Sequence, residues 1–387
     1  MAKLGEVCTI VSGSTPKTSV TSYWDGNIKW VTPAELNEDT FYIMDSIRHI
    51  TEEGKEKTGL SYLPTGTVIL SSRAPIGKTA IAGCEMCCNQ GFKNLICSDA
   101  IYNEYLYFFL KSKTDYLNSL GRGATFKEIS KSIVESIEIP LPEVNQQKEI
   151  AEKFKKLEQL ISLRKQQLAK LDELVKVRFV EMFGEPADNI NNLPASPMTA
   201  ICQIIDGDRG KNYPKQEEFS DSGFCLFLNA KNVTAQGFSF ENCTYITEEK
   251  DALLRNGKLC RGDVVLTTRG TIGNLAFYDT SVPYKNIRIN SGMVILRMNK
   301  QVVSEIFFIE QFKMQLDSIK SRIASGSAQP QLPISTMNKI EMILPPIELQ
   351  NQFAAFVECV DKQKQTVQQS LEKLELMKKA LMQEYFG

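Results

Sequence analysis

The chain has 387 residues, with 45 Lys and Arg against 46 Asp and Glu, a hydrophobic fraction of 42% and a charged fraction of 24%. This composition is typical of a globular protein and excludes a disordered chain, and the length predicts two or more domains. The net charge of −1 argues against a free-standing nucleic-acid binder, and the single histidine, His49, argues against His-based catalysis or a His-rich metal site.

The beginning of the sequence and its cysteines favour a reduced, cytoplasmic protein. No apolar signal region follows Met1, and no run of about 18 apolar residues exists that would predict a membrane span. The ten cysteines are scattered, and the tightest group is Cys84, Cys87 and Cys88, with Cys97 further on. We interpret them as small buried hydrophobic residues and expect no metal ion and no cofactor.

The chain contains an internal repeat. Residues 66–77 (GTVILSSRAPIG) recur as residues 262–273 (GDVVLTTRGTIG), and residues 50–53 (ITEE) recur as residues 246–249. The segment 141–151 resembles 344–354, and the pair FG at 183–184 recurs at 386–387. The duplication extends to charge, since residues 1–184 hold 23 basic and 23 acidic residues and the rest hold 22 and 23. We therefore predict a tandem duplication.

The residue pattern changes once along each half of the sequence. Short β-like runs, turn residues and one apolar helix-like stretch predict an α+β protein with two mixed α/β globular domains, at residues 1–140 and 198–344. A boundary marked by prolines follows each domain, and after it comes a long segment without Gly or Pro. We therefore expect long helices at 141–184 and 345–387. Residues 185–197, with three prolines and three asparagines, are predicted to be a linker.

The two long segments have the 4-3 apolar spacing of coiled coils. A helix of this length carries the chain about 55 Å at a rise of about 1.5 Å per residue, and connectivity then requires the second helix to run back. We predict an antiparallel pair, related by an approximate two-fold axis, rather than two separate amphipathic helices. The interface residues predicted from the spacing are Ile150, Phe154, Leu157, Ile161, Leu168, Leu171, Val175, Phe353, Val357, Val360, Val367, Leu371, Leu374 and Leu381.

Residues 72–79 (SRAPIGKT) nearly fit a phosphate-binding P-loop. A P-loop needs a first glycine and a lysine, but the first position is Ser72, and the repeat copy at 268–275 (TRGTIGNL) lacks the lysine. Both copies share an arginine after two hydroxyl residues, followed by Ile-Gly. We expect a strand that ends in a tight turn presenting Arg73 or Arg269.

In the order of its motifs, the chain resembles the specificity (S) subunits of Type I DNA restriction–modification systems. The motifs are KLGEV (3–7) and SGSTP (12–16), the repeated S-x-R-x-x-I-G-type segment, and GRGATFKEIS (121–130) with its copy SGSAQPQL (325–332). The run PLP (140–142) before Gln147 and Ile150, followed by a long helix, completes the pattern. The second half opens less typically, with TAIC at 199–202.

The resemblance implies that each globular domain reads one half of a bipartite DNA sequence. The paired helices would then set the spacing and dock two DNA adenine methyltransferase subunits, which restriction endonuclease/translocase subunits join. The chain itself would be non-catalytic. Its partners would be double-stranded DNA and these subunits, with no membrane.

DNA reading requires cations for phosphates and amide or guanidinium groups for base edges. We expect the shared arginines to contact phosphates or to support the fold, and the unshared Arg122, Lys127, Arg209 and Lys211 to make contacts that differ between the two half-sites. The candidates in or beside loops are Lys17, Arg73, Lys78, Gln90, Lys93, Arg122, Thr125 and Lys127 in half one, and Arg209, Lys211, Arg269, Asn274, Arg288, Asn290, Gln329 and Gln331 in half two.

Three other functions compete with this interpretation. An adenine methyltransferase would need a [DNS]-P-P-[YF] motif, whereas the only Pro-Pro, Pro345-Pro346, lies between Leu344 and Ile347. A duplicated protein-binding adaptor with a coiled coil would have the same helices. An S subunit of a combined cut-and-modify (Type IIB-like) system would have the same architecture, and the sequence does not separate it from the main hypothesis.

Overall fold

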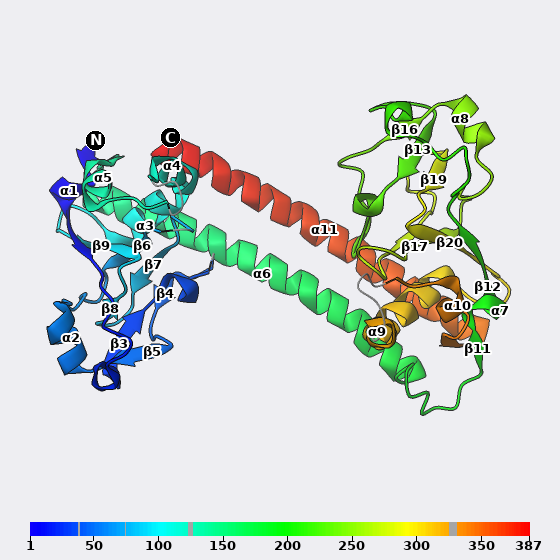
Figure 1. Ribbon diagram of the computed structural model, residues 1–387, viewed down its shortest axis with the longest axis horizontal. Coiled ribbons are helices and arrows are strands. Elements are labelled where there is room, and N and C mark those ends of the chain that lie inside the picture. The colour runs from blue at the N-terminus through cyan, green and yellow to red at the C-terminus, as the bar shows by residue number, and fades with distance from the viewer. Residues whose placement is uncertain (38, 74, 123–126, 325–330) are drawn as a thin grey trace. The chain divides into compact units, whose positions relative to one another are not determined.

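The computed structural model describes residues 1–387 except 38, 74, 123–126 and 325–330. It contains two compact units, one made of Met1–Gln166 with Gln368–Gly387, and one made of Gln167–Val367. Each unit therefore holds one globular domain together with part of each of two long helices (Figure 1).

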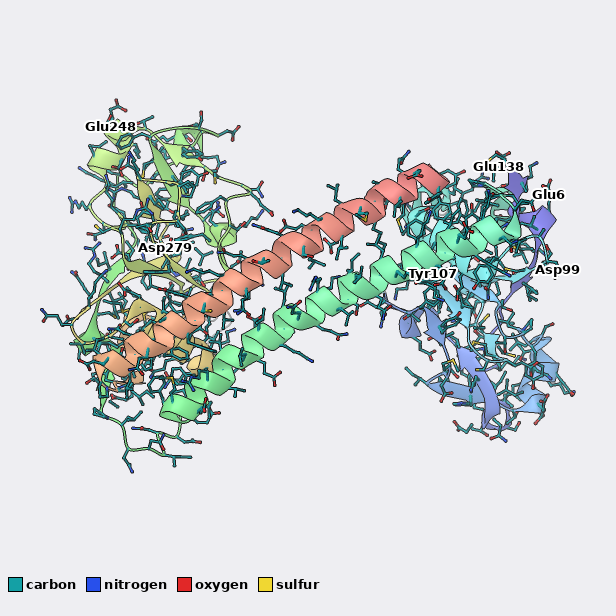
Figure 2. The ribbon with its side chains drawn as sticks, turned by 180° about the vertical axis from the view of Figure 1, so that it is seen from behind. Glu6, Asp99, Tyr107, Glu138, Glu248 and Asp279 are labelled. Atoms are coloured by element: carbon teal, nitrogen blue, oxygen red, sulfur yellow. The ribbon has the colours of Figure 1, made fainter. Side chains whose placement is uncertain are left out.

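The first unit contains a five-stranded sheet, a three-stranded sheet and a short edge pair. The five-stranded sheet has the order β2 (Cys8–Ser12), β9 (Phe92–Cys97), β6 (Val68–Ser71), β7 (Thr79–Ala82), β4 (Tyr42–Ile43). The three-stranded sheet has the order β5 (Arg48–Ile50), β3 (Trp24–Val31), β8 (Cys87–Cys88), with β3 and β8 parallel. The edge pair joins β1 (Ala2–Lys3) to β10 (Glu138–Ile139) at the end labelled by Glu6 and Glu138 in Figure 2.

The second unit repeats the order of these strands, except that, among the described residues, its larger sheet has no strand in the place of β4. Its four-stranded sheet has the order β12 (Cys202–Asp206), β20 (Met293–Met298), β17 (Asp263–Thr267), β18 (Leu275–Phe277). Its three-stranded sheet has the order β16 (Tyr245–Ile246), β13 (Cys225–Leu228), β19 (Ile287–Ile289), again with one parallel pair. The pair β11 (Ala195–Pro197) and β21 (Glu341–Ile343) repeats β1 and β10, and β14 (Val233–Thr234) pairs with β15 (Gly237–Phe238).

Short helices connect these strands in the same order in each unit. Equivalent N-caps begin α2 and α8, where the hydroxyls of Thr51 and Thr247 accept hydrogen bonds from backbone amides. The helices of the first unit are α1 (Leu4–Val7), η1 (Thr21–Tyr23), η2 (Pro33–Glu35), α2 (Glu52–Thr58), α3 (Asn103–Ser112), α4 (Thr114–Leu120) and α5 (Lys131–Ser136). Those of the second are α7 (Met198–Ile201), η3 (Gln216–Glu218), η4 (Ala230–Asn232), α8 (Glu248–Leu253), α9 (Glu305–Ala324) and α10 (Ile334–Met337).

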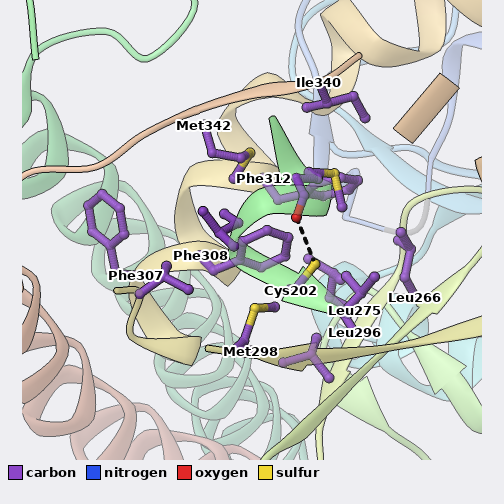
Figure 3. Packing of buried hydrophobic residues seen from close by; sticks show 14 of the residues in the cluster. Cys202, Leu266, Leu275, Leu296, Met298, Phe307, Phe308, Phe312, Ile340 and Met342 are labelled. Atoms are coloured by element: carbon purple, nitrogen blue, oxygen red, sulfur yellow. Dashed lines mark hydrogen bonds between the residues drawn. The ribbon is translucent and has the colours of Figure 1, made fainter. Parts of the chain in front are cut away.

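The main core of each unit lies between its larger sheet and the long helices. In the first unit α3 is buried at every position from Glu104 to Leu110, because the sheet covers one side and the long helices cover the other. In the second unit Phe307, Phe308 and Phe312 of α9 occupy this place (Figure 3). Figure 3 also shows Cys202, whose thiol donates a hydrogen bond of 3.2 Å to the carbonyl oxygen of Met198.

The two long helices are α6 (Val144–Phe183) and α11 (Ile347–Phe386), with 40 residues each. In the first unit, Lys378 Nζ lies 2.8 Å from Glu158 Oε1. In the second, Lys364 Nζ lies 2.7 Å from Asp172 Oδ1. Residues early in α6 thus meet residues late in α11, and the reverse holds at the other end, so the predicted antiparallel pair is confirmed.

The residues predicted for the helix interface are all buried or half-buried, the half-buried ones being Leu168, Leu374 and Leu381. The heptad pattern missed Phe179, Phe183 and Phe386, which are buried with an exposure of 2% or less. From Val175 onward the buried positions recur every four residues instead of alternating four and three. The reason is that the helix ends pack into the globular cores, where a wider face is covered than in a two-helix seam.

A buried glutamine fixes the start of each long helix. Gln147 Nε2 donates to the carbonyl oxygens of Ala100 and Pro142, and its Oε1 accepts from the amide of Tyr102. Gln350 makes the three equivalent bonds, to Val302, Pro345 and Ser304. Each glutamine therefore ties the first turn of its helix to the turn before α3 or α9.

The segment predicted as a linker, 185–197, is only partly irregular. Gly184 ends α6 with φ +79°, and Asn189 and Asn192 also have positive φ, as turns require. Ala195–Pro197 instead forms strand β11, which pairs with β21. The second globular domain therefore begins with the same β–α–β arrangement as the first, although TAIC at 199–202 does not show it.

Candidate nucleic-acid interface

The turn after β6 presents Arg73 on a tightly bonded loop. The hydroxyl of Ser71 donates to the carbonyl oxygen of Pro75 at 2.8 Å and accepts from the amide of Lys78 at 2.8 Å. Gly77 closes the turn with φ +97° and donates its amide to the carbonyl oxygen of Ser71. Antiparallel strands β6 and β7 flank this turn, whereas a P-loop joins a strand to a helix, so the prediction of a strand that ends in a tight turn is confirmed.

The second unit builds the same turn from the equivalent residues. Thr267 takes the place of Ser71, donating to the carbonyl oxygen of Thr271 and accepting from the amide of Asn274. Gly273 has φ +94° and donates to the carbonyl oxygen of Thr267. Arg269 therefore occupies the position of Arg73, and the side chains of both arginines are exposed.

Three further loops join each arginine turn. In the first unit, Ser72 donates its amide to the carbonyl oxygen of Gly91 and accepts at its own carbonyl from Ile129. Gly13 lies so close to Asn89 that a Cβ there would meet the Asn89 carbonyl oxygen at 1.9 Å, which only glycine avoids. We call residues 13–17, 72–77, 89–91 and 121–129, so far as they are described, the loop cluster of the first unit.

The loop cluster of the second unit has the same backbone pattern. Thr268 donates to the carbonyl oxygen of Gly292 and accepts from Leu332, and a Cβ on Gly207 would meet the Asn290 carbonyl oxygen at 2.2 Å. Arg209 also reaches this cluster, donating to the carbonyl oxygen of Ser291 at 3.3 Å. The cluster comprises residues 207–211, 268–273, 290–292 and 331–332.

Five of the residues predicted from the first half lie exposed in or beside its cluster: Lys17, Arg73, Gln90, Arg122 and Lys127. Gln90 accepts a hydrogen bond from the hydroxyl of Thr15. Arg122 forms a β-bridge with Glu128, which also forms a β-bridge with Arg73 of the arginine turn. The structure thus brings cations and an amide from loops far apart in sequence to one end of the sheet.

Arg209, Lys211, Arg269 and Gln331 are the exposed candidates in the second unit's cluster. Asp208, which sequence reasoning missed, holds the loop that carries the first two. Its carboxylate accepts from the amides of Gly210 at 2.7 Å and Arg255 at 2.7 Å. Burial acts to raise the pKa of Asp208, but these hydrogen bonds outweigh it and leave the pKa below its usual range.

Five predicted DNA contacts bind groups of their own domain instead: Lys78, Lys93, Asn274, Arg288 and Asn290. Lys78 Nζ donates to the carbonyl oxygens of Pro33 at 3.1 Å and Leu36 at 2.6 Å, and Asn274 Nδ2 donates to that of Val233 at 2.9 Å. Both side chains therefore hold the equivalent 3-10 turns, η2 and η4. Asn290 is likewise a turn residue, because its Oδ1 accepts from the amide of Gly292.

Arg288 is the predicted DNA contact that the structure contradicts most clearly. Its side chain is 5% exposed, and its Nε lies 2.5 Å from Asp251 Oδ1. Its other nitrogens donate to the carbonyl oxygens of Asn256, Asp251 and Leu254. Each of its three nitrogens donates to a group inside the domain, so the side chain supports the fold rather than presenting a charge to DNA.

Lys93 is also buried, with a side chain 9% exposed, and its Nζ lies 3.2 Å from Glu128 Oε1. Arg73 Nε donates to the other oxygen of the same carboxylate at 2.9 Å. Burial acts to raise the pKa of Glu128, but the hydrogen bonds from Arg73 and Lys93 outweigh it and lower the pKa. Sequence reasoning missed Glu128 because it sought cations, although the residue lies in the 121–130 motif.

Two predicted contacts, Thr125 and Gln329, lie outside the described residues. In the part of the chain that is described, His, Cys, Asp and Glu side chains form no group of three that could hold a metal ion. Across the same residues, no helix is both long and apolar enough to cross a membrane.

Comparison with known proteins agrees with this duplicated architecture. The family model of the Type I restriction modification DNA specificity domain matches residues 1–173 and again 198–376. A Type I restriction enzyme specificity subunit of Methanocaldococcus jannaschii is 29% identical over 379 residues, covering 92% of this chain and 85% of the relative. A specificity subunit of Escherichia coli is 26% identical over 165 residues, covering 41% of this chain and 40% of the relative.

Solved structures share the fold over the whole chain. The S subunit of a Type I restriction–modification system from M. genitalium matches with a TM-score of 0.57 at 17% identity, covering 100% of this chain and 95% of that one. A chain from a structure of Type I restriction–modification complex assembly matches with a TM-score of 0.62 at 16% identity, covering 100% and 96%. With both halves matched by the family model, the chain belongs to the family of Type I restriction–modification DNA specificity subunits.

Proposed function

We propose that this chain is the sequence-specific DNA-recognition subunit of a Type I restriction–modification complex. Each globular domain reads one half of a bipartite double-stranded DNA target. The α6–α11 pair sets the spacing of the two halves and docks two DNA adenine methyltransferase subunits, and restriction subunits complete the assembly in the cytoplasm. The chain itself supplies recognition and no catalysis.

The observation that carries this proposal is the duplicated loop cluster. The two clusters share their backbone hydrogen bonds, their glycines and one exposed arginine, whereas the other exposed residues differ. A shared arginine suits the phosphate backbone, which is the same in every sequence, and differing side chains suit base edges, which vary. We assign Arg73 and Arg269 to phosphates, and Arg122, Lys127, Arg209 and Lys211 to base contacts.

The net charge of the chain indicates that the partner subunits share in binding DNA. Counterion release drives much of the affinity for DNA, and a chain of net charge −1 has little surplus of cations to supply it. The methyltransferase subunits therefore contribute most of the phosphate contacts when they close around the duplex. We expect the isolated subunit to bind its target far more weakly than the assembled complex does.

Long-read sequencing of modified bases tests the proposal. Genomic DNA is prepared from a host that carries this subunit with its methyltransferase, and from a host with the methyltransferase alone. We expect methylated adenines at one asymmetric, bipartite sequence in the first host only. Methylation that does not depend on this chain would contradict the proposal and would favour the adaptor hypothesis.

A further inference from the structure

The two loop clusters differ in charge at one equivalent position. Glu128 in the first cluster and Gln331 in the second each form a β-bridge with the exposed arginine, Arg73 or Arg269. The next residue in each case donates its amide to the carbonyl of the residue before the arginine, at 2.9 Å. Glu128 and Gln331 therefore occupy the same place in the fold, and only one of them is charged.

In the first cluster the carboxylate of Glu128 bridges two cations. Arg73 Nε and Lys93 Nζ lie 2.9 Å and 3.2 Å from its two oxygens. The Arg73 side chain is 46% exposed, so it faces solvent with its charge already offset by a neighbouring anion. Glu128 therefore offsets part of the positive charge that Arg73 presents to solvent.

In the second cluster the described residues do not form this arrangement at Arg269, although Arg209 Nη2 lies 3.1 Å from Asp206 Oδ1 nearby. Val294 takes the place of Lys93, because it pairs with Leu266 as Lys93 pairs with Leu70 at the equivalent register. Gln331 replaces the carboxylate, and no hydrogen bond or ion pair of the Arg269 side chain occurs within the described part of the chain. Among the described residues, no carboxylate therefore offsets the charge of Arg269.

We propose that Glu128 and Gln331 make the two domains bind DNA phosphates with unequal strength. The second domain holds its half-site through Arg269, which no described carboxylate offsets, while Glu128 weakens the Arg73 contact of the first. This inference rests on the proposed function, since it concerns the strength of phosphate contacts made by a DNA-recognition subunit. The first domain then depends more on its base contacts, and its half-site tolerates mismatches less than the second.

Reciprocal substitution of the two positions tests the inference in the complex with the methyltransferase subunits. Glu128→Gln keeps an acceptor beside Arg73 but removes the negative charge, and Gln331→Glu introduces the charge beside Arg269. Binding of target DNA is measured between about 50 and 200 mM salt, because each phosphate contact contributes about −0.9 to the slope of log K against log salt.

We expect Glu128→Gln to bind more tightly at low salt, with a slope steeper by about one phosphate contact, and Gln331→Glu to bind more weakly with a slope shallower by about one. Each change corresponds to a difference of about threefold in the affinity ratio between those two salt concentrations. In the Arg73→Ala background, Glu128→Gln should lose its effect, because the carboxylate acts through that arginine.

The controls are charge-matched changes away from the clusters. Glu138→Gln alters the exposed residue labelled in Figure 2, and Gln301→Glu alters an exposed turn after the far end of β20; neither should change the slope. A Glu128→Gln slope equal to or shallower than that of the unmodified complex overturns the inference, and Gln331→Glu decides it alone if Glu128→Gln folds poorly. Failure of the unmodified complex to prefer its target over unrelated DNA would instead contradict the proposed function.

Discussion

The ring of Phe154 in α6 stacks on that of Phe386, the penultimate residue of the chain, with centroids 5.6 Å apart and planes 17° from parallel. Phe386 also contacts Tyr105 and Phe109 of α3. The C-terminal turn of α11 thus closes the core of the domain in which the chain began.

Replacing Phe386 with alanine should therefore destabilise the first unit. The side chain is 2% exposed, and truncating a buried phenylalanine costs about 3–5 kcal/mol. Hydrogen exchange of the α3 and β6 amides should show faster opening, while amides of α9 should be unaffected. Leu376→Ala, at a position 68% exposed on the same helix, is the control, and equal effects of the two changes would contradict this packing argument.

Arg288→Met should lower the stability of the second unit without a direct effect on DNA specificity. Removing one partner of a buried ion pair is costly, and we expect about 3 kcal/mol because Lys258 still lies 2.5 Å from Asp251. Thermal unfolding of the variant is compared with that of Arg255→Met, which alters an exposed arginine nearby. A stable Arg288→Met protein with altered target preference would restore Arg288 as a DNA contact.

The same ion pair predicts a dependence of stability on pH. Burial acts to raise the pKa of Asp251, but hydrogen bonds from Lys258 and Arg288 outweigh it and lower the pKa below its ordinary value of 3.8. A lowered pKa in the folded state contributes stability that is complete above the unfolded value and is lost as the pH falls through the folded value. The unfolding midpoint of the second unit should fall on acidification below pH 3.8, and less steeply in Arg288→Met.

Leu171→Asp should prevent assembly with the methyltransferase subunits. Leu171 is 8% exposed in the core of the second unit, and a carboxylate there would be buried without a partner. Copurification and mass measurement of the complex should show loss of the methyltransferase, whereas Lys170→Asp, one residue away and exposed, should assemble normally. Normal assembly of Leu171→Asp would show that docking does not require the helix pair.

Combined Arg122→Ala and Lys127→Ala substitutions should weaken recognition of one half-site only. Both residues are exposed in the first cluster, and a good base contact contributes about 1–3 kcal/mol of discrimination. Methylation of the target should become slower. Single mismatches in the first half-site should then reduce the rate less than they do in the unmodified complex, while mismatches in the second half-site should have the same effect as before. Lys57→Ala, an exposed cation on α2, is the control, and an unchanged profile in the double variant would exclude these positions.

The architecture could be predicted because the sequence itself contains the heptad periodicity and the internal repeat. The repeated arginine motif and the heptads of α6 and α11 each depend on local spacing, and the antiparallel direction follows from connectivity. The strand Ala195–Pro197 was missed because three residues that include a proline carry no period. Its partner β21 lies more than 140 residues further along the chain.

The roles of the side chains in the site were harder to predict, because the type of a residue does not reveal which group it pairs with in the fold. In the sequence Arg288 resembles a loop cation, because its partner Asp251 lies 37 residues earlier. Lys78 does so too, because the sequence does not show that the carbonyl oxygens of Pro33 and Leu36 lie beside it. Glu128 carries the wrong charge for a DNA contact and becomes informative only when Arg73 and Lys93 are seen on its two oxygens.

The central claim is that each globular domain reads its own half of the target. It is tested most directly by exchanging residues 1–140 for the first domain of another specificity subunit, and then mapping methylated adenines across the host genome. We predict that one half of the bipartite sequence changes, while the other half and the spacing stay the same. A target that changes in both halves, or in neither, with the complex intact, would contradict the account.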